Sequence, residues 1–235
     1  MTILHVTDLH FTERWFAWLH ESAPAHDLLC ITGDLLDQTR PIPYRQQASL
    51  VAEWLRLLNR PVCVCSGNHD LEFMPPGQPR RPAFWLRGIS GPRLWTDENT
   101  ARLGEHRVHV IGYRDLPAEP ADIWVAHLPP AGSPVALTVR GFDAGDEALA
   151  RSVAILRPRL VLSGHVHQPT AWIGEVDGTV HLNPGCSRSS RIPNHILIDP
   201  IRGTASRVTE GPLGSDVETV SWATARPARE ERCAA

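Results

Sequence analysis

Lysine is missing from the 235-residue chain, so all 23 basic residues are arginine. We attribute the absence of lysine to coding bias rather than to function, although arginine suits bidentate contacts to phosphate. The formal net charge of −3 argues against a wholly basic surface, so there is no clear nucleic-acid surface beyond a local patch. No apolar run approaches the ~20 residues that cross a bilayer, and Met1-Thr2 leads directly into an apolar segment without a charged leader. We therefore expect no membrane attachment.

Cysteine is scarce and shows no pairing pattern. The five cysteines are odd in number and have no spacing typical of a disulfide framework. Cys63 and Cys65 lie in a short apolar run, where small buried strand residues are a better interpretation than metal ligands. These features favour a reducing compartment, and we expect the protein in the cytoplasm.

The order of apolar patterns predicts an α/β fold. Strands at 2–7, 28–32 and 62–65 alternate with helices at 13–25 and 44–58, which indicates a parallel sheet with right-handed crossovers. The second half is richer in strands, expected at 106–112, 122–126, 159–163, 170–183, 194–199 and 204–209, with one helix at 146–157. We predict a four-layer α/β/β/α sandwich with mixed sheets. Its catalytic domain would cover 1–210, and 211–235 would be a partly disordered extension.

Polar residues of metal-ligand type follow five of these apolar runs directly. The motifs, in order, are Asp8-Leu9-His10, Gly33-Asp34, Gly67-Asn68-His69-Asp70, His127, and Gly164-His165-Val166-His167. Asp8 and Asp34 could alternatively be helix N-caps. Because ligands bind at the carboxyl edge of an α/β sheet, the pattern favours a metal site at that edge.

The mixture of donors indicates which metals would suit this edge. Carboxylates and several imidazoles without clustered thiols favour Mn²⁺, Fe²⁺, Ni²⁺ or Zn²⁺ over Mg²⁺ or Ca²⁺. Seven candidate ligands are too many for one ion, and two divalent ions that share a carboxylate fit the number better. Such a pair is suited to in-line displacement at phosphorus. The seven are Asp8, His10, Asp34, Asn68, His127, His165 and His167.

These ordered motifs resemble those of the calcineurin-like metallophosphoesterase superfamily, over about residues 1–200. Leu182-Asn183-Pro184-Gly185 is similar to a strand-to-loop segment of that family, and His127-Leu128-Pro129-Pro130 is similar to a motif of its phosphodiesterase members.

The resemblance also implies a role for each matched residue. Asp8, His10 and His167 would bind one metal, preferably Mn²⁺, with bridging Asp34. Asn68, His127 and His165 would bind the second with the same bridge, and a hydroxide between the metals would attack phosphorus. His69 would assist the leaving group as a general acid, and Asp70 would orient its ring.

Two Pro/Gly-rich loops, 71–93 and 129–145, are expected to select the substrate. The Pro/Gly-rich segment 71–93 carries Arg80, Arg81 and Trp85, and Arg188 follows the last strand-to-loop segment. These residues are candidate phosphate-gripping and aromatic substrate contacts, and the competing interpretation is that the arginines are solvated loop charges.

The function predicted from the sequence is a phosphodiesterase for a small molecule or nucleotide. A phosphomonoesterase, a protein phosphatase or a nuclease could use the same site, and some members of the resembled family are non-catalytic scaffolds that have lost ligands. The filled ligand set disfavours a scaffold, and the acidic composition disfavours a nuclease. Nothing in the sequence marks an oligomeric state.

Overall fold

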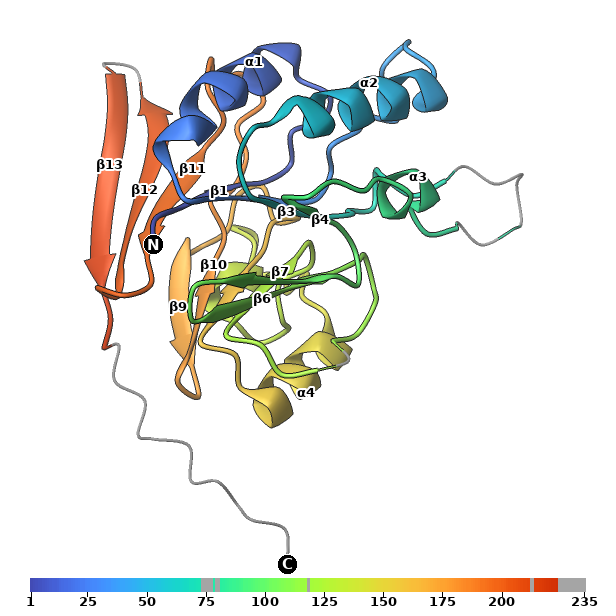
Figure 1. Ribbon diagram of the computed structural model, residues 1–235. Coiled ribbons are helices and arrows are strands. Elements are labelled where there is room, and N and C mark those ends of the chain that lie inside the picture. The colour runs from blue at the N-terminus through green and yellow to red at the C-terminus, as the bar shows by residue number, and fades with distance from the viewer. Residues whose placement is uncertain (73–77, 79–80, 118, 212–213, 224–235) are drawn as a thin grey trace, which may run out of the picture.

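Two β-sheets packed face to face form the centre of the computed structural model, with helices on both outer faces (Figure 1). The structure describes residues 1–235 except 73–77, 79–80, 118, 212–213 and 224–235. Helices α1 and α2 cover the first sheet, and α4 covers the second (Figure 1). The predicted α/β/β/α layering with two mixed sheets is confirmed.

The first sheet has seven strands in the order β13-β12-β11-β1-β2-β3-β4. β1, β2, β3 and β4 run parallel, whereas β11, β12 and β13 join as antiparallel neighbours. The bounds are β1 Ile3–Val6, β2 Leu28–Thr32, β3 Val62–Cys65, β4 Leu94–Trp95, β11 His195–Asp199, β12 Thr204–Gly211 and β13 Gly214–Ser221.

The second sheet has six strands in the order β5-β6-β7-β8-β10-β9. β6, β7, β8 and β10 are parallel, and antiparallel β5 and β9 form the edges. The bounds are β5 Thr100–Leu103, β6 His106–Ile111, β7 Ile123–Ala126, β8 Leu160–Leu162, β9 Ile173–Val176 and β10 Thr179–Leu182.

Each helix packs through one apolar stripe of its amphipathic sequence. The helices are α1 Glu13–Ser22, α2 Tyr44–Leu57, α3 Phe84–Arg87 and α4 Glu147–Leu156, with short 3₁₀ turns η1 Ala23–Ala25 and η2 Pro134–Ala136. Leu149 and Val153, for example, are the buried residues of α4. The Asp146 carboxylate accepts a hydrogen bond from the Leu149 N–H at 2.8 Å, which caps the start of α4.

Three apolar clusters correspond to the three interfaces between layers. One lies between α1, α2 and the first sheet, and a second lies between the two sheets. The third joins α4 to the second sheet and includes Trp124. Cys30, Cys63 and Cys65 belong to the cluster between the sheets and are free thiols, so the prediction of buried strand cysteines is confirmed.

The structure departs from the predicted elements in three places. Helix α1 ends at Ser22 rather than residue 25, because Pro24, which has no backbone N–H, lies in the 3₁₀ turn that follows. The two-residue β4 and the edge strand β5 were not predicted, since neither is a long apolar run. β13, Gly214–Ser221, pairs antiparallel with β12, so the first sheet has a strand beyond the last predicted one at 204–209. The predicted disorder near the C-terminus falls on 224–235, outside the described residues.

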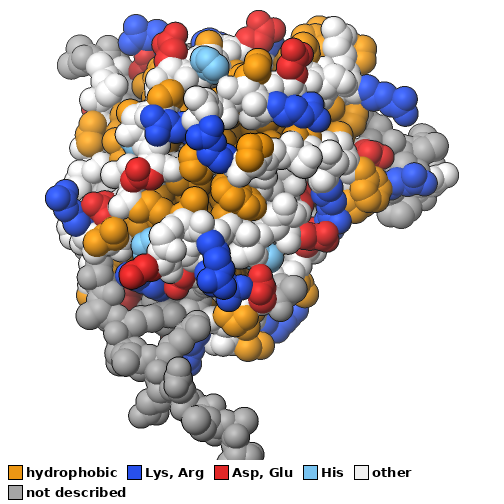
Figure 2. Space-filling view, in the orientation of Figure 1, with side chains coloured by type: hydrophobic (Ala, Val, Ile, Leu, Met, Phe, Trp, Pro, Cys, Tyr) orange, Lys and Arg blue, Asp and Glu red, His pale blue; other side chains and the backbone are white. Residues whose placement is uncertain are grey.

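The surface carries mixed charge on the face seen in Figure 2, where arginines and acidic residues are interspersed. Within the described residues, no helix is long and apolar enough to cross a membrane.

Acid sensitivity should arise in part from His181, a buried residue of β10 with no hydrogen-bond partner for either ring nitrogen among the described residues. Burial lowers its pKa from 6.5 to about 4. As pH falls below about 6.5, the unfolded chain therefore binds a proton that the folded protein does not, and stability declines. When the pH is lowered from 8 to 5, the free energy of unfolding of His181→Leu should fall by about 1–2 kcal/mol less than that of the wild type.

Denaturant unfolding at both pH values measures this difference. At pH 8 the His181 ring is neutral in both states, so the change there reports packing alone. Parallel pH profiles for variant and wild type would contradict the assignment.

Candidate metal centre

The carboxyl ends of five parallel strands bring the predicted ligands to one edge between the sheets. Asp8 and His10 follow β1, Asp34 follows β2, and Asn68 follows β3 in the first sheet. His127 follows β7, and His165 and His167 follow β8 in the second sheet. Both sheets therefore contribute to the same site.

Several ligand candidates have a backbone that non-glycine residues rarely adopt. The φ angles of Asp8, His10, Asp34 and His165 are 54°, 43°, 51° and 66°. Left-handed backbone of this kind costs free energy and is concentrated at functional sites. The left-handed conformation turns the chain as it leaves each strand, at the edge that these residues share.

The first group of donors gathers around Asp8 and His10. His167 Nε2 lies 3.2 Å from both Asp8 Oδ1 and His10 Nε2. His10 Nε2 is 3.8 Å from Asp8 Oδ1 and 3.8 Å from Asp34 Oδ2. Two imidazole nitrogens and two carboxylates thus converge on a common point.

The second group gathers on the other side of Asp34. His127 Nε2 lies 3.6 Å from Asp34 Oδ2 and 3.1 Å from Asn68 Oδ1. Asn68 Oδ1 is also 3.0 Å from His165 Nδ1. Because the same Asp34 oxygen faces His10 and His127, this carboxylate lies between the two groups.

Hydrogen bonds from outside the groups orient their members. His127 Nδ1 donates to the Thr32 carbonyl at 2.7 Å, which leaves Nε2 with a free lone pair. Asp8 Oδ2 accepts from Thr7 Oγ1 at 2.7 Å and from the His165 N–H at 3.1 Å, which leaves Oδ1 for the centre. These contacts fix ligand direction before any ion binds.

Burial sets the protonation of the site. It lowers the pKa of His10 and of His165 to about 4, so both rings are neutral at pH 7 and have lone pairs available. Burial and the neighbouring Asp8 charge raise the pKa of Asp34 well above its ordinary value. Burial opposes ionisation of Asp8 as well, but the hydrogen bond from His167 and the nearby histidines hold its pKa below the ordinary value.

The donor set fits divalent cations. Asp8, His10 and His167 offer ligand atoms within 4.8 Å of one another, and so do Asp8, Asp34 and His127. Histidine nitrogens 3.2 Å apart, both directed at a carboxylate, are an arrangement that cations stabilise. The groups are consistent with a binuclear site.

His69 lies beside the first group. Its ring centroid is 4.7 Å from that of His10, and its backbone N–H donates to Asp34 Oδ1 at 2.8 Å. The ring is half-buried, and burial lowers its pKa. His69 therefore combines an accessible imidazole with a backbone contact that holds Asp34.

The predicted contact between Asp70 and His69 is wrong. The buried Asp70 carboxylate accepts hydrogen bonds from the backbone N–H groups of Leu35, Leu36 and Gly67 at 3.2, 2.9 and 2.8 Å. His69 Nδ1 has no hydrogen-bond partner within the described part of the chain. Asp70 therefore joins the loops after β2 and β3, because several backbone donors converge on its position.

Arg188 lies at the open side of the first group. Its guanidinium is paired with the carboxylate of Asp37, which is buried. The guanidinium charge also contributes to lowering the pKa of His10 and of His69. Of the four predicted substrate contacts, Arg188 is the one that the described structure places beside the metal-ligand candidates.

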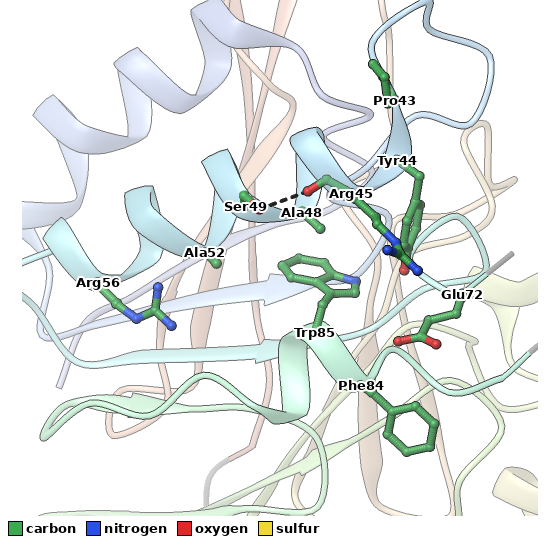
Figure 3. A pocket seen from close by; sticks show the side chains of 10 residues that line it. All are labelled: Pro43, Tyr44, Arg45, Ala48, Ser49, Ala52, Arg56, Glu72, Phe84 and Trp85. Carbon is green, nitrogen blue, oxygen red and sulfur yellow. Dashed lines mark hydrogen bonds between the residues drawn. The ribbon is translucent and has the colours of Figure 1, made fainter.

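The structure does not bring the other three predicted substrate contacts to the metal-ligand candidates within the described residues. Arg80 lies outside the described residues, and Arg81 is exposed and pairs through its backbone with Glu72. The Trp85 indole donates to the Asp70 carbonyl at 3.0 Å and faces α2 (Figure 3). It lines a cavity of about 890 Å³ whose walls include no metal-ligand candidate. Trp85 was predicted as a substrate contact; it belongs to α3, and its indole faces α2 in this cavity.

Two residues at the site were not predicted from the sequence. Asp37, three positions after Asp34, holds Arg188. The Tyr113 ring centroid lies 5.9 Å from that of His127. Tyr113 follows β6 and Gly112, so it lies at a strand end like the other site residues. It was not predicted because a search for metal ligands does not select tyrosine.

A methyl group at Gly67 should damage the centre. A Cβ there would lie 2.5 Å from the Asp34 backbone nitrogen and closer still to the Asp34 carboxylate. We expect Gly67→Ala to lower the free energy of unfolding by about 1–3 kcal/mol and to weaken metal binding, because Asp34 must shift. Thermal unfolding and metal analysis measure the two effects.

Gly91→Ala is the matched control, since its Cβ would meet only the Leu94 Cβ at 3.4 Å, an ordinary contact distance. Equal metal content in both variants would contradict the expectation.

Comparisons with known proteins agree with the architecture. The chain is 28% identical over 165 residues to a cAMP/cGMP dual specificity phosphodiesterase from Mycobacterium tuberculosis, a match that covers 65% of the chain. It spans about half of that relative's length, 52%.

Among solved structures, a purple acid phosphatase from yellow lupin has a TM-score of 0.60 at 13% identity, over 94% of this chain and 53% of that one. TT1561 of Thermus thermophilus has a TM-score of 0.57 at 15% identity, over 94% and 98% of the two chains. A Vps29 variant from Entamoeba histolytica has a TM-score of 0.50 at 18% identity, over 95% and 100%. At these identities the structural likenesses show the fold alone.

The calcineurin-like phosphoesterase profile matches residues 1–169, which include every metal-ligand candidate described above. With its two mixed sheets and its groups of converging histidines and aspartates, the chain belongs to the calcineurin-like phosphoesterase family, a family of hydrolases that act on phosphoester bonds, which includes some non-catalytic members.

Proposed function

We propose that this phosphoesterase is a binuclear-metal phosphodiesterase that hydrolyses a small phosphodiester, with a nucleotide as the preferred class of substrate. The observation that carries the proposal is the position of Asp34 Oδ2, which faces His10 at 3.8 Å and His127 at 3.6 Å. Asp8, His10 and His167 would hold one ion, preferably Mn²⁺. Asn68, His127 and His165 would hold the other, and Asp34 would bridge them.

Ions bound there supply Lewis-acid activation of the phosphoryl group and of water. The protein's own side chains position the ester and handle the proton. Arg188, held by Asp37, is placed to bind a non-bridging phosphoryl oxygen beside His10 and His69. His69, whose half-buried imidazole lies beside His10, would give a proton to the departing ester oxygen.

The preference for a diester has a separate support. The mycobacterial relative acts, by its name, on the cyclic diesters cAMP and cGMP. His127-Leu128-Pro129-Pro130 also resembles the motif of diesterase members of the family. A nuclease is disfavoured by the formal net charge of −3.

Hydrolysis of model esters tests the proposal. Protein loaded with Mn²⁺ should hydrolyse bis-p-nitrophenyl phosphate with a higher kcat/KM than p-nitrophenyl phosphate, and it should cleave cAMP or cGMP. Chelated protein is the blank, and activity should return with metal. A higher kcat/KM for the monoester would replace the diesterase proposal with a monoesterase.

A further inference from the structure

The end of β6 places an aromatic side chain beside the second half of the metal centre. β6 is parallel to β7, so Tyr113 and His127 emerge at the same edge of the second sheet. Their ring centroids are 5.9 Å apart at an interplanar angle of 56°. Tyr113 is half-buried, so part of its ring remains accessible at the edge.

A buried network holds Tyr113 in place. Its backbone N–H donates to Ser66 Oγ at 3.0 Å, and Ser66 Oγ donates to the Asp97 carboxylate at 2.7 Å. The Ser66 N–H donates to the same carboxylate at 2.8 Å, and Asp97 is buried. Because Ser66 lies two residues before Asn68, the network connects Tyr113 to the loop that supplies a ligand candidate.

Arg114 covers Tyr113 in an unfavourable backbone conformation. Its guanidinium carbon lies 5.4 Å from the Tyr113 ring centroid, and the side chain is exposed. Its φ is 63°, within a tight turn closed by the Asp115 N–H and the Gly112 carbonyl at 2.9 Å. Glycine is favoured at such a position, so Arg114 occupies it at a cost in local strain. The neighbouring acids Asp97, Glu98 and Asp115 pair with Arg87 instead.

We propose that Tyr113 and Arg114 form a subsite that stacks the planar group which stays on phosphorus, a nucleobase in the natural substrate. A guanidinium over an aromatic ring presents a planar cation on which bases stack. His69 lies beside His10, whereas Tyr113 lies beside His127. The ester group that leaves would depart next to His69. The subsite would therefore face the other ester group, which stays on phosphorus. This inference rests on the proposed diesterase function.

Two diesters with the same leaving group isolate the effect. Bis-p-nitrophenyl phosphate retains an aromatic group on phosphorus, whereas methyl p-nitrophenyl phosphate retains an alkyl group. In Arg114→Gly and Tyr113→Leu, we expect KM for the aromatic diester to rise about 5- to 10-fold, from lost stacking. KM for the methyl diester should rise far less, and kcat should change less than KM.

Stability provides an independent readout. Because glycine relieves the strain at residue 114, Arg114→Gly should keep its Tm or raise it by up to about 3 °C while it loses substrate affinity. Arg157→Gly is the matched control. Arg157 also has positive φ, 47°, but it caps the far end of α4, so its replacement should leave both KM values unchanged.

Binding measurements separate stacking from charge. By calorimetry, Arg114→Gly and the charge-retaining Arg114→Lys should both weaken AMP binding more than ribose 5-phosphate binding. Equal weakening of the two ligands, or equal KM increases for the two diesters, would overturn the stacking subsite. Failure of the wild type to hydrolyse either diester would instead reject the diesterase proposal, and the AMP measurement would still decide the subsite.

Discussion

Replacing Asp34 with asparagine should lower kcat/KM for bis-p-nitrophenyl phosphate by more than about 1000-fold, because loss of metal chemistry removes several kcal/mol of transition-state stabilisation. The Asp34 carboxylate lies against both donor groups. Asparagine has the same shape but lacks the negative charge shared by the two proposed ions. Kinetics and metal analysis of the purified variant measure the result, and both activity and metal content should fall.

Asp177→Asn is the matched control for this substitution. Asp177 is exposed at the β9–β10 turn with a φ of 49°, a conformation that asparagine tolerates. It should keep full activity and metal. An Asp34→Asn protein with normal metal content and activity within tenfold of the wild type would refute the binuclear assignment.

His69→Gln should lower kcat about 100- to 1000-fold on a diester with an alkoxide leaving group such as cAMP, within the usual range for loss of a general acid. The loss should be much smaller for bis-p-nitrophenyl phosphate, because p-nitrophenolate departs readily without a proton. The backbone contact from residue 69 to Asp34 at 2.8 Å is kept in this variant, so metal content should stay normal.

The pattern of losses identifies the role of His69. Equal losses on the two substrates would show that its ring stabilises phosphoryl charge instead of protonating the leaving oxygen. A drop in metal content would show that it is a ligand, since its ring nitrogen lies within 4.8 Å of ligand atoms of His10 and Asp34. His106→Gln is the control. His106 is the first residue of β6, at the end of that strand opposite the metal centre, so this substitution should change neither kcat nor metal content.

The sequence predicted the layers of the fold and the residues at the strand ends well, for a physical reason. In parallel strands buried on both faces, apolar runs stop where the chain leaves the sheet. A polar residue at that point, such as Asp34 after β2, therefore stands out against the run before it. Short or exposed strands give no such contrast, so β4, β5 and the exposed β13 were not predicted.

The contacts around the ligands were less predictable. The family resemblance implied that Asp70 orients the His69 ring, but the Asp70 carboxylate accepts hydrogen bonds from three backbone N–H groups elsewhere. Trp85 was assigned to the substrate from its loop, whereas its indole N–H is used by the Asp70 carbonyl. Such contacts depend on loop conformation, which residue types and spacing do not determine.

The distance along the chain between Asp8 and His167 has a consequence for folding. Their side chains are in contact although 159 positions separate them. A growing chain therefore offers no complete set of donors until most of the second sheet has formed, and short fragments would bind cations poorly. The proposed ions would bind only the folded protein, so the free energy of unfolding would rise with the logarithm of their concentration above the dissociation constant. Cellular metal supply would then regulate how much of this protein persists, in addition to how fast it works.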